Sequence, residues 1–205
     1  MSKIKHLICF FSIICLFSTL PAFAAVCHYK EDYYRLYHIH YAQTPDDCIE
    51  NIWYLEQAVK ADFANPYYAM AKIENENQWE KYRYLFMMHI NLKLVEQHLR
   101  IARKFDKKVV YFYDAPWKDE YLRNLKTAYN YYNAGYYYWN EAKLWAEKAG
   151  ISKFNFLYIT DLQNWEDERE RIATGELDYE KMLNRETTRV KKLIDELVAI
   201  DEKTY

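Results

Sequence analysis

The chain has 205 residues, a formal net charge of −2, and only three glycines and four prolines. The glycines, Gly135, Gly150 and Gly175, lie far apart, which excludes both the phosphate-binding P-loop and the glycine-rich turn of dinucleotide-binding folds. So few glycines and prolines also argue against turn-rich β-sandwiches, and the nearly balanced charge gives no electrostatic basis for binding nucleic acid. We therefore expect an all-α protein that has no nucleic-acid partner.

Residues 1–24 have the pattern of an export signal. Lys3 and Lys5 precede an apolar run from Leu7 to Leu20, and the small residues near Ala24 fit a signal-peptidase site. The apolar run is shorter than the ~18 residues that span a bilayer. We expect cleavage at this site and a periplasmic or secreted protein without an integral membrane span. An uncleaved N-terminal anchor and lipidation at a nearby cysteine are the alternatives.

The segment that follows, residues 25–43, is ambiguous. It alternates like a strand, yet Tyr34, Tyr37 and Tyr41 keep helical spacing, so we expect an extended arm or a short helix packed on the body. Cys27 and Cys48 are the cysteines left after cleavage. Exported proteins commonly pair their cysteines, so we expect a disulfide between them, with two thiols as the alternative.

A single helical domain, residues 44–205, is expected next. N-cap and proline patterns predict helix starts at Thr44-Pro45 and at Asn65-Pro66, with the first helix ending near Ala61. Apolar spacing predicts long helices over 79–104 and 117–149, the second ended by Gly150. The run 105–116 between them is predicted to contain a short strand or an extended linker. Thr160 or Asp161 and then Asp178 predict the caps of two further helices, to about 173 and 202. The expected fold is an elongated all-α array of five to seven helices.

Residues 55–72, LEQAVKADFANPYYAMAK, resemble the junction between two tetratricopeptide repeats. The positions that match the family pattern are Ala58, Asp62, Asn65, Pro66, Tyr68 and Ala71, with Phe63 where the family usually has Pro. Residues 141–149 are similar to the second helix of the repeat. The two long helices and the lack of a 34-residue period depart from the family. The resemblance implies tetratricopeptide-like hairpins of paired helices.

A second resemblance is to the periplasmic flagellar collar proteins of spirochaetes, some of which carry tetratricopeptide folds. It is prompted by the export signal, the abundance of tyrosine, and the segment Trp165-Glu166-Asp167-Glu168 through Gly175-Glu176-Leu177-Asp178-Tyr179. This resemblance implies a non-enzymatic scaffold or adaptor. Such a protein would dock other envelope or flagellar proteins as a component of the motility machinery.

No residue pattern indicates catalysis, a cofactor or a metal. Neither His89 nor His98 follows a glutamate by three residues, as a ferritin-like dimetal site requires. His38 and His40 would share a face only on a strand, and we interpret them as part of a polar N-terminal segment. One acidic cluster is interpreted as exposed charge paired along a helix: Glu166, Asp167, Glu168 and Glu170. We therefore expect no enzyme.

Tyrosine gives the strongest signal, with 22 in the chain. Over residues 117–149 the aromatic residues follow helical spacing on more than one side of the helix. One stripe would be core, and a second must meet another helix or a partner. We expect either core packing alone or a protein-binding surface made of Tyr136, Tyr137, Tyr138, Trp139 and Trp145. The alternative function is the binding of a small ligand or glycan in a tyrosine-lined groove.

Overall fold

The computed structural model describes residues 27–107, 114–201 and 203, and these form six α-helices with no strand. The expected all-α class and helix count are thereby confirmed. The export signal predicted at 1–24 lies outside the described residues, as do residues 108–113 of the predicted strand or linker. None of the helices in the described ranges is both long and apolar enough to cross a membrane.

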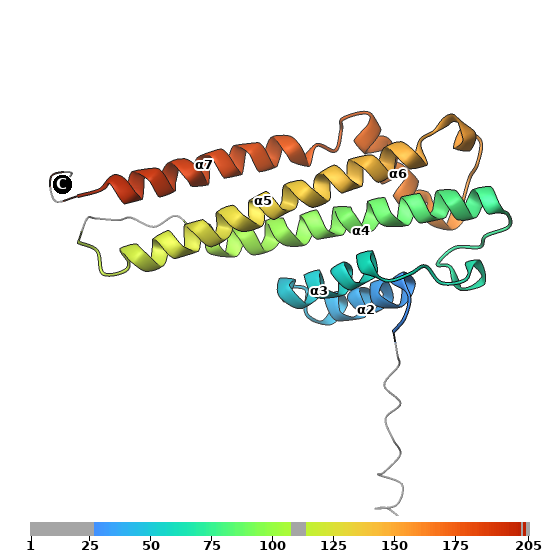
Figure 1. The fold of residues 1–205 in the computed structure, drawn as a ribbon, viewed down its shortest axis with the longest axis horizontal. Coiled ribbons are helices and arrows are strands. Elements are labelled where there is room, and N and C mark those ends of the chain that lie inside the picture. Colours follow the sequence, from blue (N-terminus) through green and yellow to red (C-terminus); the bar gives the residue numbers. More distant parts are fainter. Residues whose placement is uncertain (1–26, 108–113, 202, 204–205) are drawn as a thin grey trace, which may run out of the picture.

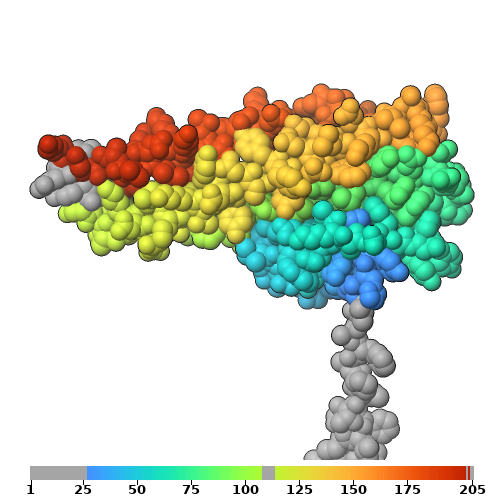
Figure 2. All heavy atoms as spheres, in the orientation of Figure 1, coloured from blue at the N-terminus to red at the C-terminus, as the bar shows by residue number. Residues whose placement is uncertain are grey.

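Two long antiparallel helices, α4 (Glu76–Phe105) and α5 (Lys118–Ala149), form the body of the molecule (Figure 1). Helix α7 (Tyr179–Ala199) lies along α5, whereas the hairpin of α2 (Lys30–Gln43) and α3 (Cys48–Lys60) packs on α4. The short helix α6 (Gln163–Ala173) contacts both α4 and α5. In the space-filling view the hairpin bulges from one side of an elongated body (Figure 2).

The caps predicted for the later helices explain why these segments become helical. Asp178 begins α7 by accepting a hydrogen bond from the backbone N–H of Lys181 at 3.2 Å. Gly150 ends α5 as predicted. Helix α4 begins three residues before the predicted position because the side chain of Asn75 accepts from the N–H of Gln78 at 2.9 Å. The apolar face predicted for α4 is fully or almost fully buried: Tyr82, Leu85, Phe86, Ile90, Leu94 and Ile101.

Two predicted helix starts are wrong. Thr44 closes α2 rather than opening α3, since its backbone N–H donates to the carbonyl of His40 at 2.7 Å. Asp47 takes the N-cap position of α3, where its side chain accepts from the N–H of Glu50 at 3.1 Å. Near the other end of the chain, Thr160–Leu162 form a 3-10 turn, η3, and α6 begins only at Gln163.

The helix predicted after Asn65-Pro66 is a single 3-10 turn, η1 (Pro66–Tyr68). The following backbone amides bind side chains of other elements instead of a helical ladder. The N–H of Met70 donates to the hydroxyl of Tyr82 at 3.3 Å, and the N–H of Lys72 donates to Asp161 at 2.9 Å. Tertiary hydrogen bonds therefore override a correct local capping signal, and the second helix of the proposed repeat junction does not form here.

In the segment predicted as an arm or a short helix, residues Lys30–Gln43 form a packed helix, so the extended-arm alternative is wrong. Helix α2 buries Tyr34 and Tyr37 against the body. At its start, the N–H of Lys30 donates to the carbonyl of Asp62 at 2.8 Å, so this end of the hairpin lies beside the end of α3. Cys48, in contrast, begins α3 at the far end of the hairpin, and 13 helical residues span about 20 Å. The fold does not bring Cys27 and Cys48 together, and the structure does not form the expected disulfide.

Candidate functional site

The five aromatic residues predicted to bind a partner do not form one surface. Tyr136 and Trp139 face α7: the hydroxyl of Tyr136 donates to the side chain of Asn184, and the ring of Trp139 lies 5.5 Å from that of Tyr179. Trp139 is only 2 % exposed. These contacts place the two residues in the packing between α5 and α7.

Two more of the five face the opposite side of α5. The hydroxyl of Tyr138 donates to Glu56 of α3 at 2.9 Å. The ring of Trp145 lies 5.9 Å from that of Tyr84 on α4, and the ammonium of Lys148 lies 3.9 Å from its centre. Tyr137 is the one member of the set with a mostly exposed side chain. The aromatic residues of α5 thus join it to α3, α4 and α7, as the core-packing alternative expects.

A cavity of about 550 Å³ opens between α2, α4 and the segment that contains η3 and α6. Its floor is aromatic and its rim is polar. The residues that line it are Tyr34, His38, Met70, His89, Lys93, Asp161, Leu162, Asn164, Trp165 and Glu168. We call the space that these residues line the α2–α4–α6 cavity.

A continuous chain of hydrogen bonds crosses the floor of this cavity. Nε2 of His89 lies 2.6 Å from the hydroxyl of Tyr34, and Nδ1 lies 2.5 Å from a carboxylate oxygen of Glu168. Because a carboxylate accepts hydrogen bonds, Nδ1 carries the proton and Nε2 accepts from the tyrosine. The indole of Trp165 stacks on the imidazole, with ring centres 4.9 Å apart and planes 22° apart. Side chains from α2, α4 and α6 therefore hold the rings of Tyr34, His89 and Trp165 in one assembly.

Burial controls the ionisation of this assembly. It lowers the pKa of His89, although the hydrogen bond and charge of Glu168 act in the opposite direction. Burial also raises the pKa of Tyr34, with smaller contributions from Tyr37 and Glu168. A phenol with a raised pKa is a poor nucleophile near neutral pH. The hydroxyl of Tyr34 therefore keeps its proton near neutral pH and donates it to the hydrogen bond with Nε2 of His89.

The rim of the cavity supplies accessible polar groups. His38 is exposed, and its ring meets that of Tyr34 edge-on at 4.5 Å. The ammonium of Lys93 lies 3.8 Å from the carboxylate of Glu168 and 3.1 Å from that of Glu96. Charges of both signs thus offset one another beside an aromatic floor, which favours an uncharged or zwitterionic guest.

We expect the free energy of unfolding to fall as the pH is lowered from 7.5 to 5.5. Burial holds the pKa of His89 below its ordinary value in the folded protein, so the unfolded chain takes up the proton first. The stabilisation that neutral His89 gives the folded protein is complete above the pKa of about 6.5 that histidine has in the unfolded chain. It is lost as the pH falls from there towards the lower pKa of His89 in the folded protein. His38 and His98 act in the same direction. The lowered pKa of Glu186 stabilises the fold above about 4.5, and this stabilisation is lost only at lower pH, outside the range considered.

Urea unfolding at several pH values measures this dependence. Each histidine contributes at most about 1.4 kcal/mol per pH unit between its folded and unfolded pKa values. Replacing His89 by Gln should reduce the slope by part of that amount. A slope that stays the same in His89→Gln would show that His89 is not a neutral buried group.

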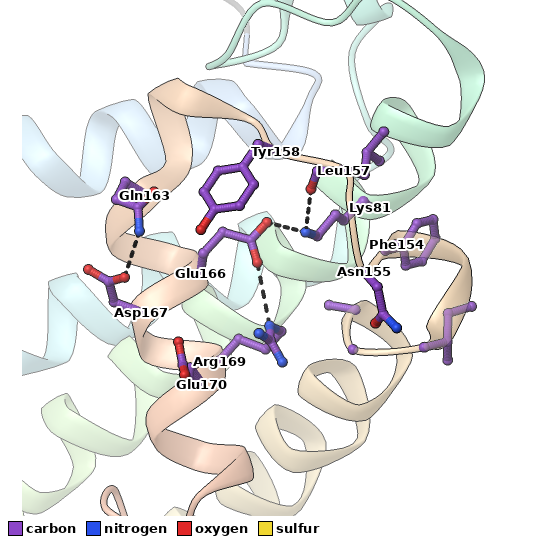
Figure 3. Close-up of a pocket in the computed structure, with 13 residues that line it drawn as sticks. Lys81, Phe154, Asn155, Leu157, Tyr158, Gln163, Glu166, Asp167, Arg169 and Glu170 are labelled. Atoms are coloured by element: carbon purple, nitrogen blue, oxygen red, sulfur yellow. Dashed lines mark hydrogen bonds and ion pairs between the residues drawn. The ribbon is translucent and has the colours of Figure 1, made fainter.

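A second, smaller pocket of about 150 Å³ surrounds a buried ion pair near the start of α6 (Figure 3). The ammonium of Lys81, only 5 % exposed, contacts the carboxylate of Glu166 and donates to the carbonyl of Leu157 at 2.7 Å. Arg169 donates to the other oxygen of Glu166 at 3.4 Å. The acidic cluster predicted to be exposed is thus divided, since Glu166 and Glu168 turn inward. Over the described ranges, no group of histidine, cysteine and acidic residues is arranged to hold a metal.

Sequence reasoning missed the cavity because its members come from distant segments. His89 and Glu168 are 79 positions apart, and Tyr34 and His89 are 55 apart. No spacing rule within one helix relates them. The helical spacing of Tyr34 and Tyr37 does place both on one buried face. In the sequence, His38 and Glu168 stand out only as polar residues, and nothing in their local pattern predicts that both line one cavity.

Comparison with known proteins gives a family without an assigned activity. A family model described as a domain of unknown function, DUF8513, matches residues 77–200, which extend from α4 to the end of α7. This range is more than half of the chain and contains His89, Trp165 and Glu168, whereas Tyr34 and His38 precede it. No curated protein and no solved structure matches the chain. The protein therefore belongs to the DUF8513 family.

Proposed function

We propose that the protein is a non-enzymatic binding protein that holds a small organic ligand in the α2–α4–α6 cavity. One observation carries this proposal: a hydrogen-bonded and stacked ring assembly, Tyr34–His89–Trp165, faces an open volume of about 550 Å³. Small-molecule sites typically have volumes of roughly 300–1,000 Å³, apolar walls and a few fixed polar groups. The export pattern of residues 1–24 supports a role outside the cytoplasm, in the periplasm or after secretion.

The lining supports a ligand that is cyclic and carries no net charge. His38 offers an exposed ring against which a flat or sugar-like ring can stack, and the buried Trp165 adds apolar surface to the lining. Lys93 and Glu168 already offset each other at 3.8 Å, so a strongly charged guest would have to compete with that pair. Asn164 and Asp161 at the rim can exchange hydrogen bonds with hydroxyl or amide groups of the guest.

The alternative function is the docking of other envelope or flagellar proteins through the aromatic residues of α5. Of the five predicted residues, only Tyr137 has a mostly exposed side chain that could contact such a partner. The other four members of that set contact α3, α4 or α7, which leaves little aromatic surface on α5 for a partner. A role as a scaffold or motility component rests on the resemblances in sequence alone. We therefore give ligand binding precedence.

A thermal-shift screen of sugars and small neutral ring compounds tests the proposal. A compound that binds only the folded protein stabilises it by about 2.7 kcal/mol at 100 times its dissociation constant, so a site ligand should raise Tm in a saturable way. We expect His38→Ala to weaken the binding of such a compound at least about tenfold, which corresponds to ~1.4 kcal/mol.

His28→Ala is the matched control, because His28 is also exposed but does not line the cavity. It should leave the affinity of the compound unchanged. The proposal fails if no compound raises Tm, or if the affinities of the His38→Ala and His28→Ala proteins are the same.

A further inference from the structure

The connector between α5 and α6 exposes aromatic side chains to an unusual degree. Its residues 151–159, ISKFNFLYI, include one lysine and no acid. Phe156 is 98 % exposed and Tyr158 is 69 % exposed. Single exposed apolar residues are common on protein surfaces, but large apolar side chains that are exposed close together mark a candidate interaction site.

The structure holds this connector firmly in place. Two of its own residues, Phe154 and Ile159, are buried, with side chains only 2 % and 3 % exposed. Between them, the buried ammonium of Lys81 donates to the carbonyl of Leu157 and pairs with Glu166 (Figure 3). Burying a charged pair carries a desolvation cost, and here the pair fixes the backbone between Phe156 and Tyr158. The backbone that carries these two exposed rings is therefore held in place by the fold.

More aromatic surface lies at the same end of the molecule. The turn η1 is found there in Figure 1, and its Tyr67 and Tyr68 are 86 % and 63 % exposed. A hydrogen bond from the N–H of Lys72 to Asp161 connects the two segments. The lysines nearby are already paired, Lys72 with Glu74 at 2.8 Å and the connector's own lysine with a carboxylate of α4 at 2.5 Å.

We propose that this end of the molecule binds a lipid bilayer by inserting Phe156 and Tyr158 into its surface. Phenylalanine favours the acyl region, and tyrosine favours the boundary where its ring is apolar and its hydroxyl is wet. A stable protein–protein interface needs about 800 Å² per partner with a hydrogen-bonding rim. Here the exposed rings project from two separate segments, and the two neighbouring lysines are already paired within the molecule. A fluid bilayer needs neither a continuous patch nor complementary charges.

Flotation with lipid vesicles tests this inference and does not depend on the ligand proposed for the cavity. The sample is the chain from residue 25 onward, which contains every helix of the described ranges and lacks the apolar export segment. We expect it to float with vesicles of zwitterionic phosphatidylcholine at both 0.1 M and 1 M salt, because apolar insertion is not screened by ions. The double variant Phe156→Ser/Tyr158→Ser should bind at least about tenfold less, given the apolar area it removes.

Tyr137→Ser is the matched control, since it removes an exposed tyrosine from the middle of α5, and it should float like the parent chain. Circular dichroism checks that all variants remain folded. The inference is overturned if the parent chain does not float, or if the double variant floats as well as the control. Binding that needs anionic phosphatidylglycerol and disappears at 1 M salt would indicate headgroup attraction and overturn it. Failure to float together with cross-links from the connector to a protein would show that a protein is the partner instead.

Discussion

Replacing Trp165 by Ala should lower the free energy of unfolding by about 3–5 kcal/mol, the range found for large aromatic side chains removed from cores. Trp165 is 7 % exposed, stacks on His89 and meets Phe86 at 5.6 Å between ring centres. Its loss would widen the α2–α4–α6 cavity and free the imidazole of His89 on one face. We therefore expect the variant to lose ligand binding as well as stability.

Urea unfolding followed by far-ultraviolet circular dichroism measures this loss without relying on tryptophan fluorescence. Trp53→Ala is the matched control, because Trp53 is 48 % exposed and borders no part of the cavity. It should cost about 1 kcal/mol or less. Equal losses in the two variants would mean that Trp165 does not carry the packing of the site.

The sequence predicts the long helices well because each depends on a local, repeated pattern. The apolar positions of α4 recur at helical spacing, and Asp178 and Gly150 mark helix ends by capping chemistry that acts within one turn. The same local rules fail after Asn65-Pro66. The backbone N–H of Met70 there donates to the hydroxyl of Tyr82, twelve positions away, and no local sequence pattern predicts this contact.

The candidate site is harder to predict because it depends on which helices meet. Glu168 directly follows Asp167 in the sequence, yet it binds His89 of α4. Asp167 instead accepts a hydrogen bond from Gln163 on its own helix (Figure 3). Which of the two turns inward is decided by how α6 rotates against α4. Likewise, the aromatic residues on several sides of α5 are compatible in sequence with an exposed binding surface. Only the structure shows that α3 and α7 pack against them.

Replacing Glu31 by Ala should lower the free energy of unfolding by about 3 kcal/mol. The carboxylate is fully buried, and it accepts from the N–H of Ala64 at 2.9 Å and from the hydroxyl of Tyr82 at 3.1 Å. Each buried donor left without an acceptor costs about 1–3 kcal/mol. Helix α2 would then lose one of its polar links to α4, and urea unfolding measures the loss.

Glu76→Ala is the matched control, since Glu76 also lies in the first turn of its helix but is exposed. It removes only the favourable interaction of an acid with the helix dipole, about 0.3–1 kcal/mol. A double-mutant cycle with Tyr82→Phe isolates the link itself, because losing both partners should cost less than the sum of the single losses. Strict additivity would contradict the direct contact.

The position of this link gives it a functional consequence. Tyr82 lies within residues 77–200, the range that defines the family, whereas Glu31 belongs to the preceding hairpin. The same hairpin carries Tyr34 and His38, which complete the lining of the cavity beside Trp165. The Glu31→Ala protein should therefore bind a cavity ligand more weakly even where it remains folded. A variant that loses stability but keeps its affinity would show that the family domain forms the binding site without the hairpin.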